Sequence, residues 1–206
     1  MIFSLALLRV AQHCLFGLAT ALLAYYGYSL VETASFQDRQ EARFARLMEG
    51  PPTANAAPAA ARTLMGRLQI PRLHVSAIIV AGTAEQDLKL GIGHIEGTSM
   101  PGTPGNIGLA GHRDTFFRPL RNIRLQDQIQ LTTLEGEFTY RVTSTQIVPP
   151  TKVEVLSPGN GEELTLVTCY PFFILGTAPD RFIVRAARVH QSATTRKAAS
   201  FEQNYR

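Results

Sequence analysis

Cysteine and charge are both scarce in this chain. Of its 206 residues, 2 are cysteine, 17% are charged and 45% are hydrophobic. This composition fits one globular domain with accessory segments, and it excludes intrinsic disorder for the bulk of the chain.

Neither sign of charge dominates the sequence. The 20 Lys and Arg residues stand against 16 Asp and Glu residues, and between residues 63 and 190 the balance is 12 basic to 11 acidic residues. The small basic excess therefore lies in the flanking segments. A nearly neutral domain without a basic stripe excludes long-range capture of nucleic acid or another polyanion.

Motifs for nucleotides, metals and repeats are missing as well. No Gly-rich phosphate loop precedes a helix, no internal repeat stands out, and neither CxxC nor HExxH occurs. The histidines are isolated from one another in the sequence: His13, His74, His94, His112 and His190. Nucleotide chemistry and a zinc site therefore have no support in the sequence.

The N-terminal segment contains one long uncharged stretch, CLFGLATALLAYYGYSLV at 14–31. Its length approaches the roughly 20 residues needed to cross a bilayer. Arg9 precedes the stretch, whereas Glu32 and Asp38 follow it. We therefore predict a cytoplasmic N-terminus at 1–13, an uncleaved single-pass anchor in the plasma membrane and an extracytoplasmic remainder. A cleaved signal peptide is the alternative, but the stretch is longer than usual for one and lacks an A-x-A site.

The composition changes twice beyond the predicted anchor. Residues 32–63 begin with helix formers and continue into GPPTANAAPAAA, which predicts a stalk and a Pro/Ala-rich linker. A domain at 64–190 follows, and a polar tail at 191–206 carries no recognisable motif.

The domain at 64–190 has the pattern of an all-β fold. Alternation predicts one buried face for the strands around Ile129 and Tyr140. Only short helical turns fit the pattern, near 84–90 and 116–123. Many short strands without long helices predict a small closed β-barrel or a sandwich. The predicted strands cover residues 65–70, 75–80, 107–112, 129–132, 138–147, 164–169 and 182–189.

Three residue types suggest nucleophilic chemistry. With Cys14 inside the predicted anchor, Cys169 has no intramolecular partner, and it lies at a strand end where a thiol is both held and accessible. His112 also ends a predicted strand, and imidazole can act as general base and acid for a thiol. Arg181 and Arg185 share a strand face, and either guanidinium could stabilise an oxyanion. Periodicity alone leaves open which arginine acts. It also leaves open that none of these residues is catalytic: Cys169 could be a buried thiol and His112 a solvated turn residue, and the arginines could form an ion-paired strand face.

Several segments of the chain resemble the sortase family of membrane-anchored cysteine transpeptidases, over essentially all of 64–189. The sequences around the histidine and after the cysteine are most similar to class D sortases. The matching segments are TLVTC at 165–169, LAGHRDTFF at 109–117, APDRFIVRA at 178–186 and GIGHIEGTSMPGTPGN at 91–106.

The resemblance implies a role for each candidate residue. Cys169 would be the nucleophile, His112 the general acid/base, and Arg181 rather than Arg185 the stabiliser of the transition state. It also implies an eight-stranded sortase-type barrel and no organic cofactor. The loop acids that regulate some members through calcium cannot be mapped onto this chain, so no metal is predicted.

The function implied by the resemblance is transpeptidation. The enzyme would cut an LPxTG-like C-terminal sorting signal of a surface protein, hold it as a Cys thioester, and transfer it to an amine of the cell wall or of a pilin. Two alternatives are a cysteine L,D-transpeptidase of peptidoglycan and a membrane-tethered β-barrel that binds a partner without catalysis. The Ser-His/Arg-Gly-Cys segment of the first is missing.

Substrate selection is predicted to lie in the segment 145–161, which leads into the cysteine strand. Its apolar side chains would accept those of the substrate, and its few charges argue against selection by ion pairing. The predicted substrate-binding residues are Val153, Val155, Leu156 and Thr168.

Overall fold

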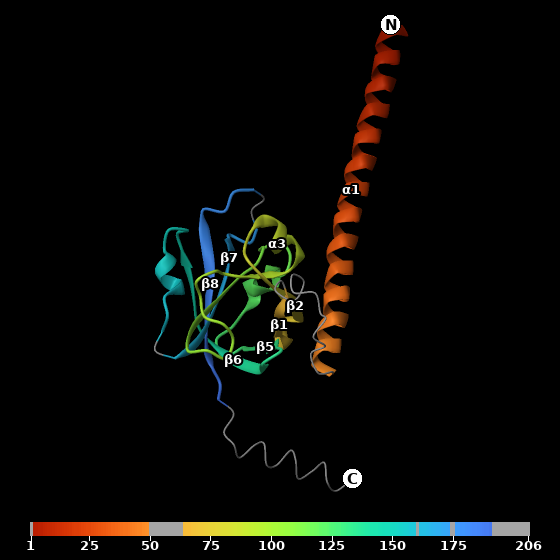
Figure 1. Ribbon diagram of the computed structural model, residues 1–206. Coiled ribbons are helices and arrows are strands. Elements are labelled where there is room, and N and C mark those ends of the chain that lie inside the picture. Colours follow the sequence, from red (N-terminus) through yellow and green to blue (C-terminus); the bar gives the residue numbers. More distant parts are fainter. Residues whose placement is uncertain (1, 50–63, 160, 174–175, 191–206) are drawn as a thin grey trace.

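Eight strands close into a barrel in the computed structural model, which describes residues 2–49, 64–159, 161–173 and 176–190 (Figure 1). Around the barrel the order is β1-β2-β3-β4-β7-β8-β6-β5. The strands are β1 (Leu64–Ile70), β2 (Val75–Ala81), β3 (Ile92–His94), β4 (Gly105–Ala110), β5 (Gln128–Thr133), β6 (Gly136–Val148), β7 (Glu162–Tyr170) and β8 (Asp180–Arg188). The predicted linker at 50–63 and tail at 191–206 lie outside the described residues.

The barrel interior contains the apolar residues that alternate along the strands. Ile129 and Leu131 of β5 and Tyr140 and Val142 of β6 are fully buried, which confirms the predicted one-sided strands. These residues pack together with buried residues of the other strands in one hydrophobic core. Of the two predicted architectures, the chain therefore forms the closed barrel and not the sandwich.

Most of the predicted elements are present. Seven predicted strands coincide with β1, β2 and β4 to β8 within a few residues, and the two predicted helical turns correspond to α3 (Glu85–Leu90) and the 3₁₀ helix η2 (Arg118–Asn122). The sequence patterns missed β3, which has three residues in a glycine-rich stretch and shows no alternation. They also missed the 3₁₀ helices η1 (Pro71–Leu73) and η3 (Val153–Leu156).

Strand directions decide which connections share one end of the barrel. β2 is antiparallel to β1 and parallel to β3, and β4 is antiparallel to β3 and parallel to β7. Therefore β1, β4 and β7 all run in the same direction. Their C-terminal ends, with η1, His112 and Cys169, lie at one end of the barrel, which we call the η1 end.

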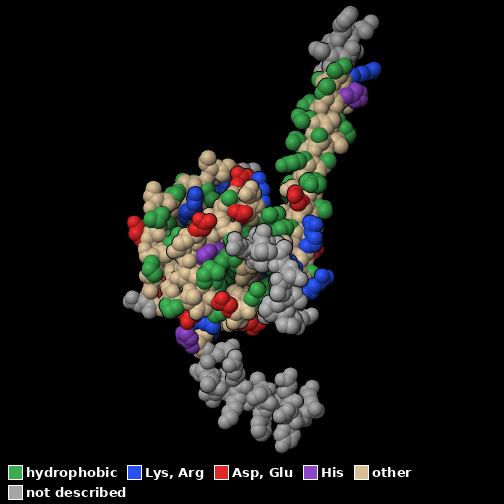
Figure 2. Space-filling model, in the orientation of Figure 1, with side chains coloured by type: hydrophobic (Ala, Val, Ile, Leu, Met, Phe, Trp, Pro, Cys, Tyr) green, Lys and Arg blue, Asp and Glu red, His purple; other side chains and the backbone are tan. Residues whose placement is uncertain are grey.

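Helix α1 (Ile2–Glu49) runs unbroken through the predicted anchor and the first part of the predicted stalk. An 18-residue window within Arg9–Arg46 has a mean hydropathy of 1.5, and none of it is buried. Figure 2 shows hydrophobic side chains along the part of the helix that projects beyond the barrel. By length and composition, this helix is apolar enough to cross a membrane.

The C-terminal part of α1 lies against β1 and β2. Phe44 is buried with Leu64, Ile78 and Val80. The backbone N–H of Ile78 donates a hydrogen bond of 3.0 Å to the side-chain oxygen of Gln37. The helix is thus packed onto the outside of the barrel rather than connected to it by the linker alone (Figure 1).

Candidate active site

Cys169 and Arg181 face each other on two neighbouring strands, and His112 lies just past the end of a third strand beside them. We call these three residues the row. β7 and β8 are antiparallel, and their register pairs Cys169 with Arg181. β4 and β7 are parallel, and their last pair is Ala110 with Val167. Continued two residues past the end of β4, this register would bring His112 level with Cys169. Residues from three distant parts of the sequence therefore meet at the η1 end.

The row faces outward and is partly open to solvent. In β7, Leu164 and Leu166 point into the core, so the alternation places Val167 and Cys169 on the outer face. Cys169 is partly exposed, as are His112 and Arg181. A thiol in this setting is held by the sheet and accessible from outside, which is what a nucleophile requires.

Two hydrogen bonds fix the position of His112 relative to Cys169. The backbone N–H of Gly111 donates to the carbonyl oxygen of Val167 at 3.1 Å, and the hydroxyl of Thr168 donates to the carbonyl oxygen of Gly111 at 2.7 Å. A Cβ atom on Gly111 would lie 2.7 Å from the ring of Phe117, so a larger residue would disturb this junction. The two strand ends are therefore joined immediately before the histidine and the cysteine.

Arg181 is held by the connection that precedes β8. Its Nη1 donates hydrogen bonds to the carbonyl oxygens of Ala178 at 3.1 Å and Asp180 at 3.0 Å. Arg185, the alternative that periodicity left open, pairs with Thr165 in the register and contacts the carboxylate of Glu163 at 3.3 Å. Arg185 is thus ion-paired and lies four residues away from the row that contains the thiol.

Arg113 is a residue of this region that sequence reasoning missed. It is only 4% exposed, and its guanidinium donates to the carbonyl oxygen of Pro171 at 2.7 Å and to that of Gly176 at 2.9 Å. Its nearest carboxylate, Asp114, is largely exposed and 3.5 Å away. Arg113 therefore connects the segment after the histidine to the segment after the cysteine through two charge-assisted hydrogen bonds.

Aromatic rings fix the chain on the far side of the cysteine. Phe172 packs edge-on against Tyr170 and Phe182, with ring centroids 6.0 and 5.3 Å apart. The next residue, Phe173, is 82% exposed, and the guanidinium of Arg121 lies 6.0 Å from its ring centroid. One side of this segment is therefore anchored in the core, while the other presents an apolar ring at the surface.

Helix α3 contributes charged groups near the histidine. Glu85 and Lys89 form an ion pair of 2.8 Å on this helix. The hydrogen bond and the charge of Lys89 lower the pKa of Glu85, and the charge of His112 lowers it further. Glu85 thus lies close enough to His112 for their charges to interact, at the solvent-exposed edge of the row.

The structure separates the predicted substrate-binding residues into two groups. Val153 is 64% exposed and Leu156 is partly buried, whereas Val155 is buried against Val148 and Ile183. The side chain of Thr168 is also buried, with its hydroxyl bonded to Gly111. Val153 and Leu156 have surface that is open to a ligand in this conformation. Val155 does not, because η3 packs against the sheet, and Thr168 does not, because its side chain points into the barrel.

The acids of the cysteine strand are engaged by arginines. Glu163 contacts Arg185 at 3.3 Å, and Glu162 lies 3.6 Å from Arg188. Among the described ranges, no three His, Cys, Asp or Glu side chains come together in a way that could hold a metal ion.

Comparisons with known proteins agree with this geometry. A family model described as the sortase domain matches residues 68–189. Sortase D of Bacillus subtilis is 41% identical over 125 residues, which are 60% of this chain and 63% of that protein. The chain thus covers less than two thirds of the length of this relative.

Solved structures show the same fold. A Clostridium perfringens Sortase D5 transpeptidase superposes with a TM-score of 0.64 and 25% identity, covering 76% of this chain and 99% of that one. Sortase C1 of Streptococcus agalactiae has a TM-score of 0.59 and 30% identity, covering 68% and 74%. The predicted eight-stranded sortase-type barrel is confirmed.

Proposed function

Because the chain belongs to the sortase family, we propose that it is a cysteine transpeptidase that cleaves an LPxTG-like sorting signal and transfers the acyl group to an amine. The observation that carries this proposal is the pairing of Cys169 on β7 with Arg181 on β8, together with His112 just past the end of the neighbouring β4. A nucleophile, a proton carrier and a permanent cation meet there on one accessible face.

The first half of the reaction is acylation. The Cys169 thiolate attacks the carbonyl carbon of the bond that follows threonine, and the developing oxyanion receives hydrogen bonds from Arg181. As the carbon–nitrogen bond breaks, protonated His112 gives its proton to the leaving amine. The products are a thioester on Cys169 and a released C-terminal peptide.

The second half transfers the acyl group. An amine attacks the thioester, neutral His112 accepts the proton of that amine, and the carbon–sulfur bond breaks to return the Cys169 thiolate. The thioester keeps the acyl group activated, so an amine can compete with water. The acceptor would be an amine of the cell wall or of a pilin.

The outer face beside Cys169 is the proposed place for the substrate peptide. Val167 and Ile183 form the next row below Cys169 and Arg181, and η3 packs on that row. Exposed Val153 and partly buried Leu156 present apolar surface at the same place. We assign substrate contact to these two residues, and assign Val155 and Thr168 to holding the loop and the strand end in position.

The anchor supports a location at the outer face of the plasma membrane. Arg9 precedes the apolar stretch and acidic residues follow it, which favours a cytoplasmic N-terminus. A membrane-bound enzyme and substrates that share the same surface meet at a raised effective concentration. In spheroplasts, an impermeant thiol reagent added outside should label Cys169 in the wild type and in Cys14→Ala. Labelling only after lysis would reverse the topology.

The experiment that tests the function uses the full chain in detergent micelles. The protein is incubated with a library of LPxTG-like peptides, with and without a soluble amine, and the products are identified by mass spectrometry. We expect cleavage after threonine, a covalent adduct on Cys169 and a new amide when the amine is present. Cleavage of peptidoglycan stem peptides instead would favour an L,D-transpeptidase, and absence of any adduct would favour a binding module.

A further inference from the structure

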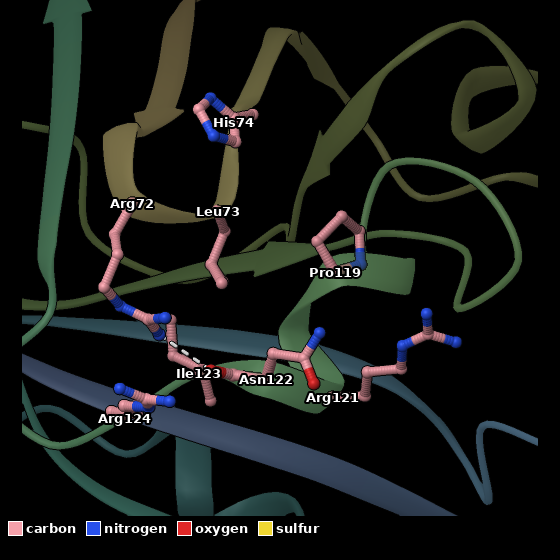
Figure 3. A pocket seen from close by; sticks show the side chains of 8 residues that line it. All are labelled: Arg72, Leu73, His74, Pro119, Arg121, Asn122, Ile123 and Arg124. Atoms are coloured by element: carbon pink, nitrogen blue, oxygen red, sulfur yellow. Dashed lines mark hydrogen bonds between the residues drawn. The ribbon is translucent and has the colours of Figure 1, made fainter.

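A basic cleft lies between η1 and η2 at the η1 end of the barrel (Figure 3). Its volume of about 570 Å³ is in the range of small-molecule sites. In Figure 3, Arg72 and Arg124 lie on one side of the cleft and Arg121 lies on the other. The residues that line it are Arg72, Leu73, His74, Pro119, Arg121, Asn122, Ile123 and Arg124.

The charge of this cleft is poorly neutralised. Arg72 is paired with Asp127 through two hydrogen bonds of 2.5 Å, and that carboxylate also accepts the backbone N–H of Arg124 at 2.8 Å. The described residues that line the cleft include no carboxylate, and the side chains of Arg121 and Arg124 are exposed. The cleft therefore presents guanidinium donors to whatever lies outside it.

Three arginines in and just after η2 concentrate positive charge near the cleft. Arg118, Arg121 and Arg124 recur at every third residue. A 3₁₀ helix has three residues per turn, so Arg118 and Arg121 are stacked on the same side of η2, while Leu120 is buried beneath them. Arg121 in η2 and Arg124 just after it both line the cleft, and guanidinium groups on its two sides are suited to an anion with several oxygen atoms.

The contacts of α1 show where this end of the barrel lies along the helix. Phe44 packs with Leu64 at the start of β1, and Glu41, one turn earlier in α1, pairs with Arg67 further along β1. β1 therefore runs antiparallel to α1, toward the half of the helix that contains the predicted membrane span.

The length of α1 below the predicted span and the length of β1 together place the cleft near the membrane surface. From residue 44 back to residue 31, where the predicted span ends, α1 rises about 20 Å. From Leu64 to Ile70, β1 extends up to about 20 Å in the same direction. The cleft follows β1 directly through η1, so it reaches the level at which the span ends.

We propose that the basic cleft formed by Arg72, Arg121 and Arg124 binds the phosphate of an anionic lipid headgroup, and so holds the η1 end of the barrel against the bilayer. The inference rests on the membrane anchor of the proposed function, but not on the transpeptidation chemistry. Since His112 and Cys169 lie at the same end, the reacting row would face the membrane surface, where a substrate with its own membrane tail is cleaved.

The test uses the full chain in lipid nanodiscs and measures amide hydrogen exchange in η1 and η2. We expect exchange at 71–74 and 118–124 to be about tenfold slower in phosphatidylglycerol discs than in phosphatidylcholine discs. The variant Arg121→Gln/Arg124→Gln should lose this difference. The matched control Arg39→Gln/Arg46→Gln removes the same charge from exposed sites on α1 that do not line the cleft, and it should keep the difference.

Three results would overturn the proposal. Equal amide exchange of the wild type in both kinds of disc would show that the cleft does not bind anionic lipid. Loss of the same protection in the control variant would show that the effect depends on net charge alone and not on the cleft. Protection by added inorganic pyrophosphate in phosphatidylcholine discs, without protection by phosphatidylglycerol, would assign the cleft to a soluble anion. Cleavage of soluble peptides in detergent is measured in parallel, and its failure in the wild type would count against the proposed function alone.

Discussion

The hydroxyl of Thr168 donates a hydrogen bond of 2.7 Å to the carbonyl oxygen of Gly111. These two residues immediately precede Cys169 and His112, so this buried hydrogen bond extends the pairing of β7 with β4 to the ends that carry the thiol and the imidazole. Together with the backbone bond from Gly111 to Val167, it fixes the relative position of the two strand ends.

Replacing Thr168 with valine removes this bond while nearly preserving the shape of the side chain. The carbonyl of Gly111 loses a buried donor, which should cost about 1–3 kcal/mol of stability and lower kcat more than it raises KM. Unfolding in urea and peptide cleavage measure the two effects. The control is Thr165→Val, which breaks a buried bond of 2.8 Å to Asn106 on the same strand. If both variants lose activity equally, the Thr168 bond has no special positioning role.

Replacing Cys169 with alanine should abolish both cleavage and the covalent adduct. The loss of one sulfur atom from a partly exposed site leaves little void, so the fold should persist. Intact-mass spectrometry of protein mixed with peptide detects the adduct, and circular dichroism checks the fold. Cys14→Ala, which removes the other thiol, should behave as the wild type. Turnover by Cys169→Ala would refute the thioester mechanism.

Replacing Arg181 with lysine keeps the charge but loses the planar set of donors. The oxyanion would be stabilised less well, and we expect kcat/KM to fall on the order of 10²-fold. Arg185→Lys, on the same strand face but paired with Glu163, should cost far less. The assignment would be reversed by a near-normal Arg181→Lys together with an inactive Arg185→Lys.

Replacing Arg113 with glutamine should release the segment after Cys169. Its two hydrogen bonds to Pro171 and Gly176 are charge-assisted and buried, and hydrogen bonds of this kind contribute about 1.5–3 kcal/mol each. We expect faster amide exchange at 176–180 and a lower kcat, with partial rescue in Arg113→Lys. Arg141→Gln, an exposed change on β6, should leave both unchanged. A lower melting temperature with normal kcat would make Arg113 purely structural.

The Asp127–Arg72 pair should make stability depend on acid pH. The hydrogen bonds from Arg72 lower the pKa of the buried Asp127 carboxyl below 3.8 in the folded protein. A lowered pKa stabilises the fold above the unfolded value, and this stabilisation is lost as the pH falls from about 4 through the folded value. Urea midpoints between pH 2 and about 6 should show the loss in the wild type. Asp127→Asn should remove that component, and an unchanged slope would contradict the assignment.

The sequence was a good guide to elements whose pattern is local. β5 and β6 show alternation that the barrel interior later uses, so their faces and approximate ends were predictable. β3 was not, because its three residues gain their strand geometry from pairing with β2 and β4 rather than from their own pattern. Closure of the barrel was likewise one of two predicted outcomes, since it depends on the distant pairing of β1 with β5.

Parts of the candidate site depended on contacts that a linear sequence does not display. An arginine after a histidine gives no sign that it will be buried, so Arg113 was missed. Val155 has the character of an exposed loop residue, yet η3 folds onto Val148 and Ile183 and covers it. The roles of Cys169, His112 and Arg181 were suggested by family motifs, and the variants above test those of Cys169 and Arg181.

The place of β8 in the barrel has a consequence for biosynthesis. β8 is the last described strand in the sequence, but it lies between β6 and β7 and supplies the partner of Cys169. While the chain is being made, β6 and β7 lack the strand that joins them until nearly all of the domain has emerged. Cys169 therefore meets Arg181 in one of the final steps of folding, and if both act as proposed, an incomplete chain carries a cysteine that is not yet active.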